Sequence, residues 1–160
     1  MSYAIAGLGS NIGNRSENLN KAIEALRSLP KTSVESISGF YETKPFGVPN
    51  KQEDYLNCCI LLNTKLSASM LLGGFLGIEA ALGRVRTFRF AERIIDIDLL
   101  LYDDVIMNEE DLTLPHPRIK ERAFVLVPLN DICKDQTFYN FCFEEEYNKI
   151  NKEGVKLCVN

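Results

Sequence analysis

Two aspartates in the second half of the sequence have a spacing that suits metal binding. Asp96 and Asp98 lie in the apolar run at 94–102, which has the length and composition of a buried strand. Side chains alternate between the faces of a strand, so we expect both carboxylates on one face and Ile97 in the core. Adjacent carboxylates repel unless a cation lies between them, and Mg²⁺ prefers one or two carboxylates with phosphate oxygens and water. The pair therefore predicts a magnesium site.

Four arginines precede this strand: Arg84, Arg86, Arg89 and Arg93. Guanidinium groups stay charged and can fork two hydrogen bonds onto phosphate oxygens, and phosphoryl transfer is catalysed mainly by positioning and charge stabilisation. With the aspartates, they favour a site for magnesium and a polyphosphate. A solvated basic loop beside a strand end is the plainer interpretation, and it would be preferred for a lone DxD pattern.

His116 is the only histidine, and prolines flank it on both sides. The nearby Arg118, Lys120 and Arg122 should depress its pKa, which suits a neutral side chain that hydrogen-bonds a phosphate. We therefore favour a ligand-binding histidine over a general base. A loop histidine without function is the alternative.

The segment at 55–59 places Tyr55, Asn57 and Cys59 on one face of an expected strand. An asparagine offers a donor and an acceptor together, which matches the edge of a pterin-like heterocycle. Aromatic side chains such as Phe46, Phe90 or Phe124 could stack on the ring. An amphipathic strand that faces water is the alternative, and it would be preferred if the segment stood alone.

Three glycines follow one another as Gly7, Gly9 and Gly13. Their GxGxxxG spacing departs from the dinucleotide-binding fingerprint, so the signal is weak. We expect a tight turn that needs permissive φ angles.

Composition limits the class of protein. The chain has 160 residues, of which 46% are hydrophobic and 25% charged, as expected for one globular domain over 1–160. Its net charge of −4 disfavours a nucleic-acid partner. Its apolar stretches are too short to span a bilayer, so we expect no membrane partner. Five cysteines without CxxC spacing suit free thiols in the cytoplasm. The oligomeric state stays open, with a monomer slightly favoured.

The apolar patterns predict the order β-α-β-β-α-β. We expect a strand at 3–8, a helix between a cap at Ser16 and a stop at Pro30, strands at 32–41 and 55–62, a helix that starts after Ser67 or Ser69, and a strand at 94–102. This order is typical of a ferredoxin-like α/β sandwich of the α+β class with a βαββαβ core. Beyond Pro128 the pattern fades, and we expect a final strand or helix as additional C-terminal elements.

The second expected helix carries a carboxylate on an apolar stripe. Glu79 is that residue. The residues expected on its face are Leu72, Phe75, Leu76, Glu79 and Leu82.

The sequence resembles the 6-hydroxymethyl-7,8-dihydropterin pyrophosphokinase family. The motifs that carry the resemblance are GLGSNIGNR, FYETKPFG, DYLNCC, IEAALGRVR, RFAERIIDIDLLLY and LPHPRIKERAFVLVPL. The resemblance implies a ferredoxin-like fold and transfer of pyrophosphate from ATP to the pterin hydroxymethyl group, with release of AMP, in folate biosynthesis. It also implies two Mg²⁺ ions.

The resemblance extends to individual residues. It implies that Asp96 and Asp98 bind the metal ions, and that Arg84 and Arg93 stabilise the transfer. The nucleotide-site residues that it implies are Glu79, Arg86, Arg89, Thr113, His116 and Arg122. The pterin-site residues that it implies are Thr43, Pro45, Phe46, Tyr55, Asn57, Phe90 and Phe124. Phe90 stands where many members have Trp, Leu76 where a Gln is common, and the segment from Arg86 to Arg89 is a residue shorter than in some members.

Two other functions stay open on these residues. A simple kinase or nucleotidyl transferase could use the same aspartates and arginines, and it would release a different product. A ferredoxin-like fold also hosts RNA-binding modules, although the basic and aromatic strand typical of them is missing from this sequence.

Overall fold

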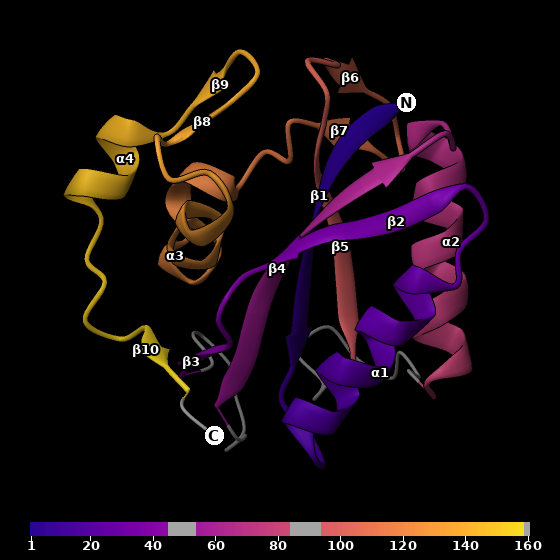
Figure 1. Ribbon diagram of the computed structural model, residues 1–160. Helices are drawn as coiled ribbons and strands as arrows, with labels where there is room; N and C mark the ends of the chain where they lie inside the picture. The colour runs from indigo at the N-terminus through magenta and orange to yellow at the C-terminus, as the bar shows by residue number, and fades with distance from the viewer. Residues whose placement is uncertain (45–53, 84–93, 159–160) are drawn as a thin grey trace.

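The structure is a computed structural model that describes residues 1–44, 54–83 and 94–158 (Figure 1). Its elements in chain order are β1 (Ser2–Ser10), α1 (Arg15–Arg27), β2 (Thr32–Ile37), β3 (Tyr41–Thr43), β4 (Tyr55–Thr64), α2 (Ala68–Ala81), β5 (Asp96–Tyr102), β6 (Met107–Asn108), β7 (Thr113–Leu114), a 3₁₀ turn at Ile119–Glu121, α3 (Ala123–Ile132), β8 (Thr137–Phe138), β9 (Phe141–Cys142), α4 (Glu144–Lys149) and β10 (Lys156–Leu157).

The main sheet has the strand order β10-β3-β4-β1-β5, and β2 also pairs with β4. Its pairs are antiparallel. β1, α1, β2, β4, α2 and β5 follow one another along the chain, with the short β3 between β2 and β4, and give the βαββαβ core that the sequence predicted. The ferredoxin-like α+β fold is therefore confirmed.

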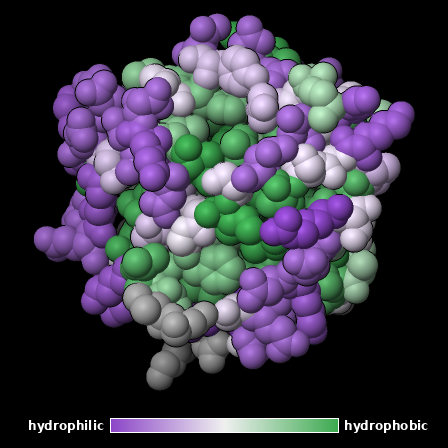
Figure 2. Space-filling model, in the orientation of Figure 1, coloured by the Kyte–Doolittle hydropathy of each residue, from purple (hydrophilic) through white to green (hydrophobic). Residues whose placement is uncertain are grey.

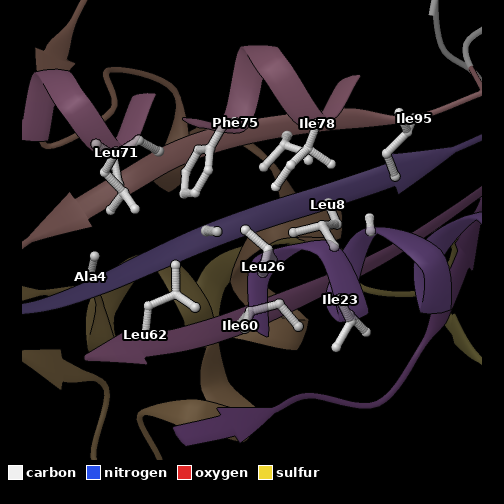
Figure 3. Close-up of a cluster of buried hydrophobic side chains, with 14 of the residues drawn as sticks. Ala4, Leu8, Ile23, Leu26, Ile60, Leu62, Leu71, Phe75, Ile78 and Ile95 are labelled. Atoms are coloured by element: carbon white, nitrogen blue, oxygen red, sulfur yellow. The ribbon is translucent and has the colours of Figure 1, made fainter. Parts of the chain in front are cut away.

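Helices α1 and α2 cover one face of the sheet, and their apolar side chains form the larger core (Figures 1 and 3). Phe75 of α2 and Leu26 of α1 are fully buried against Ile60 of β4. Burying apolar area in this way is the main favourable contribution to folding. This core fixes the helix-covered face, and functional side chains must lie on the other face or at the ends of the sheet.

Helix α3 lies on the opposite face of the sheet, where a second apolar cluster forms (Figure 1). Leu126 and Leu129 of α3 are fully buried there beside Ile5 of β1. Figure 2 shows hydrophilic side chains gathered over α4 and an apolar area in the middle of this view.

The start of α1 differs from the prediction. Asn14 is the N-cap, and its side chain accepts a hydrogen bond from the Glu17 amide at 3.1 Å, so Ser16 lies inside the helix. Asparagine is among the best N-cap residues. The predicted cap, Ser16, therefore lies two residues after the observed cap. For α2, Ser67 is the cap, and its side chain accepts from Met70, as one of the two alternatives predicted.

The strand expected at 32–41 is two strands. The backbone N–H of Gly39 donates to Asp131 of α3 at 2.9 Å, so it leaves the sheet ladder and separates β2 from β3. The predicted stripe of α2 was also partly wrong, because Leu76 is 49% exposed while Leu71 and Ile78 are buried.

The C-terminal elements were largely missed. Helix α3 carries Pro128 in its interior and has no side-chain cap at its start. Its sequence therefore lacks a capping residue and contains a residue that usually ends a helix, so the pattern did not predict it. Burial of its apolar residues against the sheet holds it in place. The later elements are short, and β10 returns to pair with β3. None of the helices in the described ranges is long and apolar enough to cross a membrane.

The buried ring of Phe75 gives a test of this packing. We expect Phe75→Ala to lower the free energy of unfolding by about 3–5 kcal/mol, because it leaves a cavity under α2. The matched control is Met70→Ala in the same helix, whose side chain is 61% exposed and which should change stability by less than about 0.5 kcal/mol. Denaturant unfolding measures both, and equal effects would contradict the assigned core.

Candidate active site

Asp96 and Asp98 lie on the face of β5 that is opposite to helices α1 and α2. Both are half-buried, whereas Ile95, Ile97 and Leu99 are at most 3% exposed and belong to the core under those helices. The predicted alternation along this strand is therefore confirmed. Metal binding by the pair stays a prediction.

The strand register aligns the aspartates with the asparagine of β4 across two glycines of β1. Gly9 pairs with Asp96 on one side and with Asn57 on the other. Gly7 pairs in the same way with Asp98 and Cys59. Directly opposed residues in an antiparallel sheet project to the same face, so these rows share the α3 face. Neighbouring strands are about 4.8 Å apart, so roughly 10 Å separates the strand of the carboxylates from that of Asn57.

The backbone of β1 at Gly7 and Gly9 forms the floor of the site between the carboxylates and Asn57, and the two glycines leave the space above it open. A Cβ atom on Gly9 would lie 2.7 Å from Asn57 Oδ1, and one on Gly7 would lie 3.0 Å from Leu100 Cδ1. Both glycines lie inside β1, so the prediction of a tight turn was wrong for them. It is correct only for Gly13, which has φ of 72°. The space between carboxylates and amide is therefore bounded by bare backbone.

Asn57 is held in a fixed orientation. It is 8% exposed, and its Nδ2 donates to Thr43 Oγ1 at 3.1 Å. Thr43 pairs with Tyr55 at the end of β3 and β4. The predicted shared face of Tyr55, Asn57 and Cys59 is confirmed. It does not face water, because α3 packs over β4. These groups form a polar corner that could read the edge of a flat ring.

The N-terminal end of α3 lies above this floor. The Cys59 thiol contacts the carbonyl oxygen of Val125 at 3.9 Å, so the first turn of α3, to which Phe124 belongs, lies over the face that carries Asn57. The Arg122 guanidinium lies 5.5 Å from the centre of the Phe124 ring. Burial lowers the pKa of Arg122, Arg118 adds to that effect, and Asp98 and Asp96 oppose it. Arg122 is therefore close enough to interact electrostatically with both carboxylates.

His116 lies beside β5, the strand that carries the two carboxylates. Its backbone N–H donates to Leu100 O at 2.9 Å, and its Nδ1 accepts from the Arg118 amide at 3.3 Å. A neutral ring with Nδ1 as acceptor carries its proton on Nε2. Burial lowers the pKa of His116, as do Arg122 and Arg118, while Asp96 opposes them. The ring is thus a neutral Nε2–H donor near pH 7.

The expected cause of this pKa shift needs one correction. The direction is confirmed, but burial is the largest cause, and Lys120 is not among the causes. Lys120 points elsewhere, with its ammonium 3.8 Å from Glu146 and 5.1 Å from the Phe141 ring centre.

Glu79 is a buried carboxylate at the free edge of β5. It is 4% exposed, and its Oε2 accepts from the Ile97 amide at 2.8 Å. Ile97 stands between the two aspartates, so this bond holds the strand that carries them. Thr113 lies in β7, which contacts β5. A nucleotide contact of either residue stays a prediction.

Several predicted site residues lie outside the described residues: Pro45, Phe46, Arg84, Arg86, Arg89, Phe90 and Arg93. The residues on either side of the arginine segment are close together, since a Cβ on Gly83 would lie 3.8 Å from Ile94 Cδ1. Ile94 is two residues before Asp96. The described neighbours of the arginines therefore lie at the carboxylate end of the site.

A separate hollow of about 640 Å³ lies at the opposite end of β1. Its lining includes Tyr3, Leu61 and Phe138, and it contains none of the predicted site residues. The aligned row of carboxylates, glycines and amide is therefore a distinct site.

The thiols near this site are poor nucleophiles. All five cysteines are free, and burial raises the pKa of Cys58 and of Cys59 well above the usual range. Cys59 therefore stays protonated on the α3 face, and covalent catalysis by it is disfavoured.

Comparison with known proteins gives the family. The 7,8-dihydro-6-hydroxymethylpterin-pyrophosphokinase (HPPK) family matches residues 5–134. The 2-amino-4-hydroxy-6-hydroxymethyldihydropteridine pyrophosphokinase of Methylorubrum extorquens is 41% identical over 156 residues, which cover 98% of both chains. The protein of that name from Haemophilus influenzae is 41% identical over 140 residues, covering 88% of this chain and 87% of its own.

A solved structure supports the fold. Wild-type HPPK-DHPS from Plasmodium falciparum with pteroate matches with a TM-score of 0.75 and 16% identity, over 98% of this chain and 47% of the solved chain. This chain thus spans about half the length of that protein. The family match and the two close relatives confirm the resemblance seen in the motifs. The chain belongs to the 7,8-dihydro-6-hydroxymethylpterin-pyrophosphokinase family.

Proposed function

We propose that this protein transfers pyrophosphate from ATP to the hydroxymethyl group of 6-hydroxymethyl-7,8-dihydropterin and releases AMP, as a step of folate biosynthesis. The observation that carries the proposal is the row formed by Asp96, Gly9 and Asn57, with oxygen ligands at one end and a ring-reading amide at the other. A phosphate group and a heterocycle could therefore bind next to each other on one face of the sheet.

The carboxylate end fits magnesium. Two carboxylates project from one strand face beside a floor of glycine backbone, and such oxygen donors suit Mg²⁺ together with phosphate oxygens. Asp96 and Asp98 would hold the metal, for which we propose two ions. When bound, magnesium neutralises charge on the phosphates and orients them for displacement.

The nucleotide end is cationic and donor-rich. We assign the Nε2–H of His116 and the guanidinium of Arg122 to phosphate or nucleotide oxygens, because both groups lie near the carboxylates and both can donate hydrogen bonds. Glu79 and Thr113 complete the described nucleotide residues. The arginines assigned to the same ligand are Arg84 and Arg93, for stabilising the transfer, and Arg86 and Arg89, for binding ATP.

The pterin end orients the attacking alcohol. Asn57 and Thr43 would hydrogen-bond the ring edge, while Tyr55 and Phe124 would pack beside or on the ring. Pro45, Phe46 and Phe90 are assigned here from the family motifs. In the reaction, the substrate oxygen attacks the β-phosphorus, the bond from that phosphorus to the bridging oxygen of the α-phosphate breaks, and AMP leaves with that oxygen. Positioning supplies most of the catalysis, since the reaction needs no protein nucleophile.

We also propose the setting in which the protein works. Its partners are the two small molecules, without nucleic acid or membrane, and it acts in the cytoplasm as a monomer. Mass measurement of the purified protein in solution would test the monomer.

The product separates this function from that of a simple kinase. With Mg-ATP and the pterin alcohol, we expect one AMP for each pyrophosphorylated pterin, because attack occurs at the β-phosphorus. Chromatography of the nucleotides measures the ratio. Stoichiometric ADP would show attack at the γ-phosphorus and would rule out the proposal.

Loss of one metal-site carboxylate gives a second test. Asp98→Ala should lower turnover by at least about a hundredfold, because several kcal/mol of charge stabilisation depend on the metal. The protein should stay folded, since Asp98 is only half-buried. Asp104→Ala, an exposed aspartate just after β5, is the matched control and should retain activity. Near-normal turnover of Asp98→Ala would remove it from the metal site.

The open floor gives a third test. Gly9→Ala should raise the KM for the pterin by about tenfold to a hundredfold, because its Cβ would displace Asn57 Oδ1. Asn57→Ala should do the same, and the KM for ATP should change little in either variant.

The effects of Gly9→Ala and Asn57→Ala on the KM should not be additive, because Gly9→Ala acts by displacing the side chain of Asn57. In an Asn57→Ala background, Gly9→Ala should add less than about threefold to the KM for the pterin. Steady-state kinetics of the four proteins measure the coupling. Fully additive effects would show that Gly9 acts independently of Asn57.

A further inference from the structure

Arg15, the first residue of α1, makes two contacts that the proposed reaction does not use. Its Nη1 donates to the backbone oxygen of Asp54 at 2.7 Å, and its Nη2 lies 3.1 Å from Glu42 Oε1. Glu42 belongs to β3, and Asp54 comes just before β4. One guanidinium therefore joins both stems of the connection between β3 and β4.

The base of this side chain is fixed. Asn14 caps α1, and the side chain of Asn18 donates to Ile12 O at 2.9 Å and to Ser10 Oγ at 3.2 Å. Ser10 is fully buried at the end of β1. The turn from β1 into α1 is therefore tied at several points, and Arg15 extends from a well-supported backbone.

The two contacts lie next to the predicted pterin residues. Thr43 follows Glu42 and Tyr55 follows Asp54, and Thr43 and Tyr55 form the last pair of β3 with β4. β3 has only three residues, and its other neighbour, β10, has two. A short strand pair is weakly held by its own ladder, so an external tie at its end has a large effect on where Thr43 lies.

The tie acts on position more than on stability. The side chains of Arg15 and Glu42 are 25% and 36% exposed, and ion pairs of this kind contribute little to the free energy of unfolding. A guanidinium presents its nitrogens in a rigid plane, so it fixes the relative placement of two acceptors better than a lysine ammonium does.

We infer that Arg15 is a positioning residue for the pterin site, which it supports by holding Glu42 and Asp54 so that Thr43 and Tyr55 keep their places beside Asn57. This inference rests on the proposed function. It also explains why an arginine is needed directly after the cap of α1, where the helix itself needs no cation. Near a helix N-terminus, a positive charge is mildly unfavourable.

Kinetics with each substrate varied in turn test the inference. Arg15→Ala should raise the KM for 6-hydroxymethyl-7,8-dihydropterin by about tenfold or more, because the polar corner loses its placement. The KM for ATP should stay within about twofold, since the carboxylates lie on β5, two strands away from β4 and three from β3. Arg15→Lys should show a smaller rise, and Glu42→Gln, which keeps an acceptor oxygen, the smallest.

The matched control is Arg27→Ala in the last turn of the same helix. Arg27 has an exposed ion pair with Glu24 and contacts neither stem, so both KM values should match the wild type. If Arg15→Ala does not fold, Arg15→Lys and Glu42→Ala decide between the outcomes, because the first keeps both charges but loses the planar guanidinium, and the second keeps Arg15 but removes one of its acceptors.

The outcomes separate this inference from the function on which it rests. If the wild type makes no pyrophosphorylated pterin, the proposed function is wrong and the inference falls with it. If the wild type is active but folded Arg15 variants keep the wild-type KM for the pterin, only the inference is wrong. A similar rise in both KM values would indicate general loosening of the structure and would also overturn it.

Discussion

The register that aligns β5, β1 and β4 is the constraint on which the site depends. Asp96, Gly9 and Asn57 share a face only because each strand pairs with the next at these positions. A slip of one residue would turn the carboxylates or the amide into the apolar core, which makes the register strongly specified by burial. The irregularity between β1 and β5 falls at Ile5 and Ala6, so both aspartates lie in the regular part of the pairing.

The same register explains how the sheet serves two cores and one site. The residues between the functional positions, such as Leu8, Ile97 and Cys58, are buried under α1 and α2. On the functional face, α3 covers part of the sheet, and the buried polar Asn57 is paired with Thr43 there. Buried polar groups need such partners. The site therefore occupies the part of the second face where polar groups are satisfied by one another.

Local pattern predicted the parts of this arrangement that depend on alternation along one strand. Because side chains alternate between the two faces of a strand, the sequence predicted the apolar neighbours of Asp96 and the shared face of Tyr55 and Asn57. The apolar runs predicted the order of the elements. The role of Gly9 could not be predicted in this way, because it depends on Asn57, 48 residues later in the chain. The break at Gly39 and the tie made by Arg15 depend likewise on distant residues. Pattern within one element carries no information on such contacts.

Charge segregation is the last consequence of the arrangement. The chain carries a net charge of −4, yet Arg122 lies near the carboxylates of β5. His116 is half-buried and close to Arg118 and Arg122, which lowers its pKa and keeps the ring neutral. A third cation at His116 would repel these two arginines at close range, whereas a neutral ring still donates a hydrogen bond. Since the thiols of Cys58 and Cys59 are protonated and the histidine is uncharged, the described groups near the carboxylates that can act on a polyphosphate are fixed charges and fixed donors. Such a site favours catalysis by placement and electrostatics over proton transfer by a protein side chain.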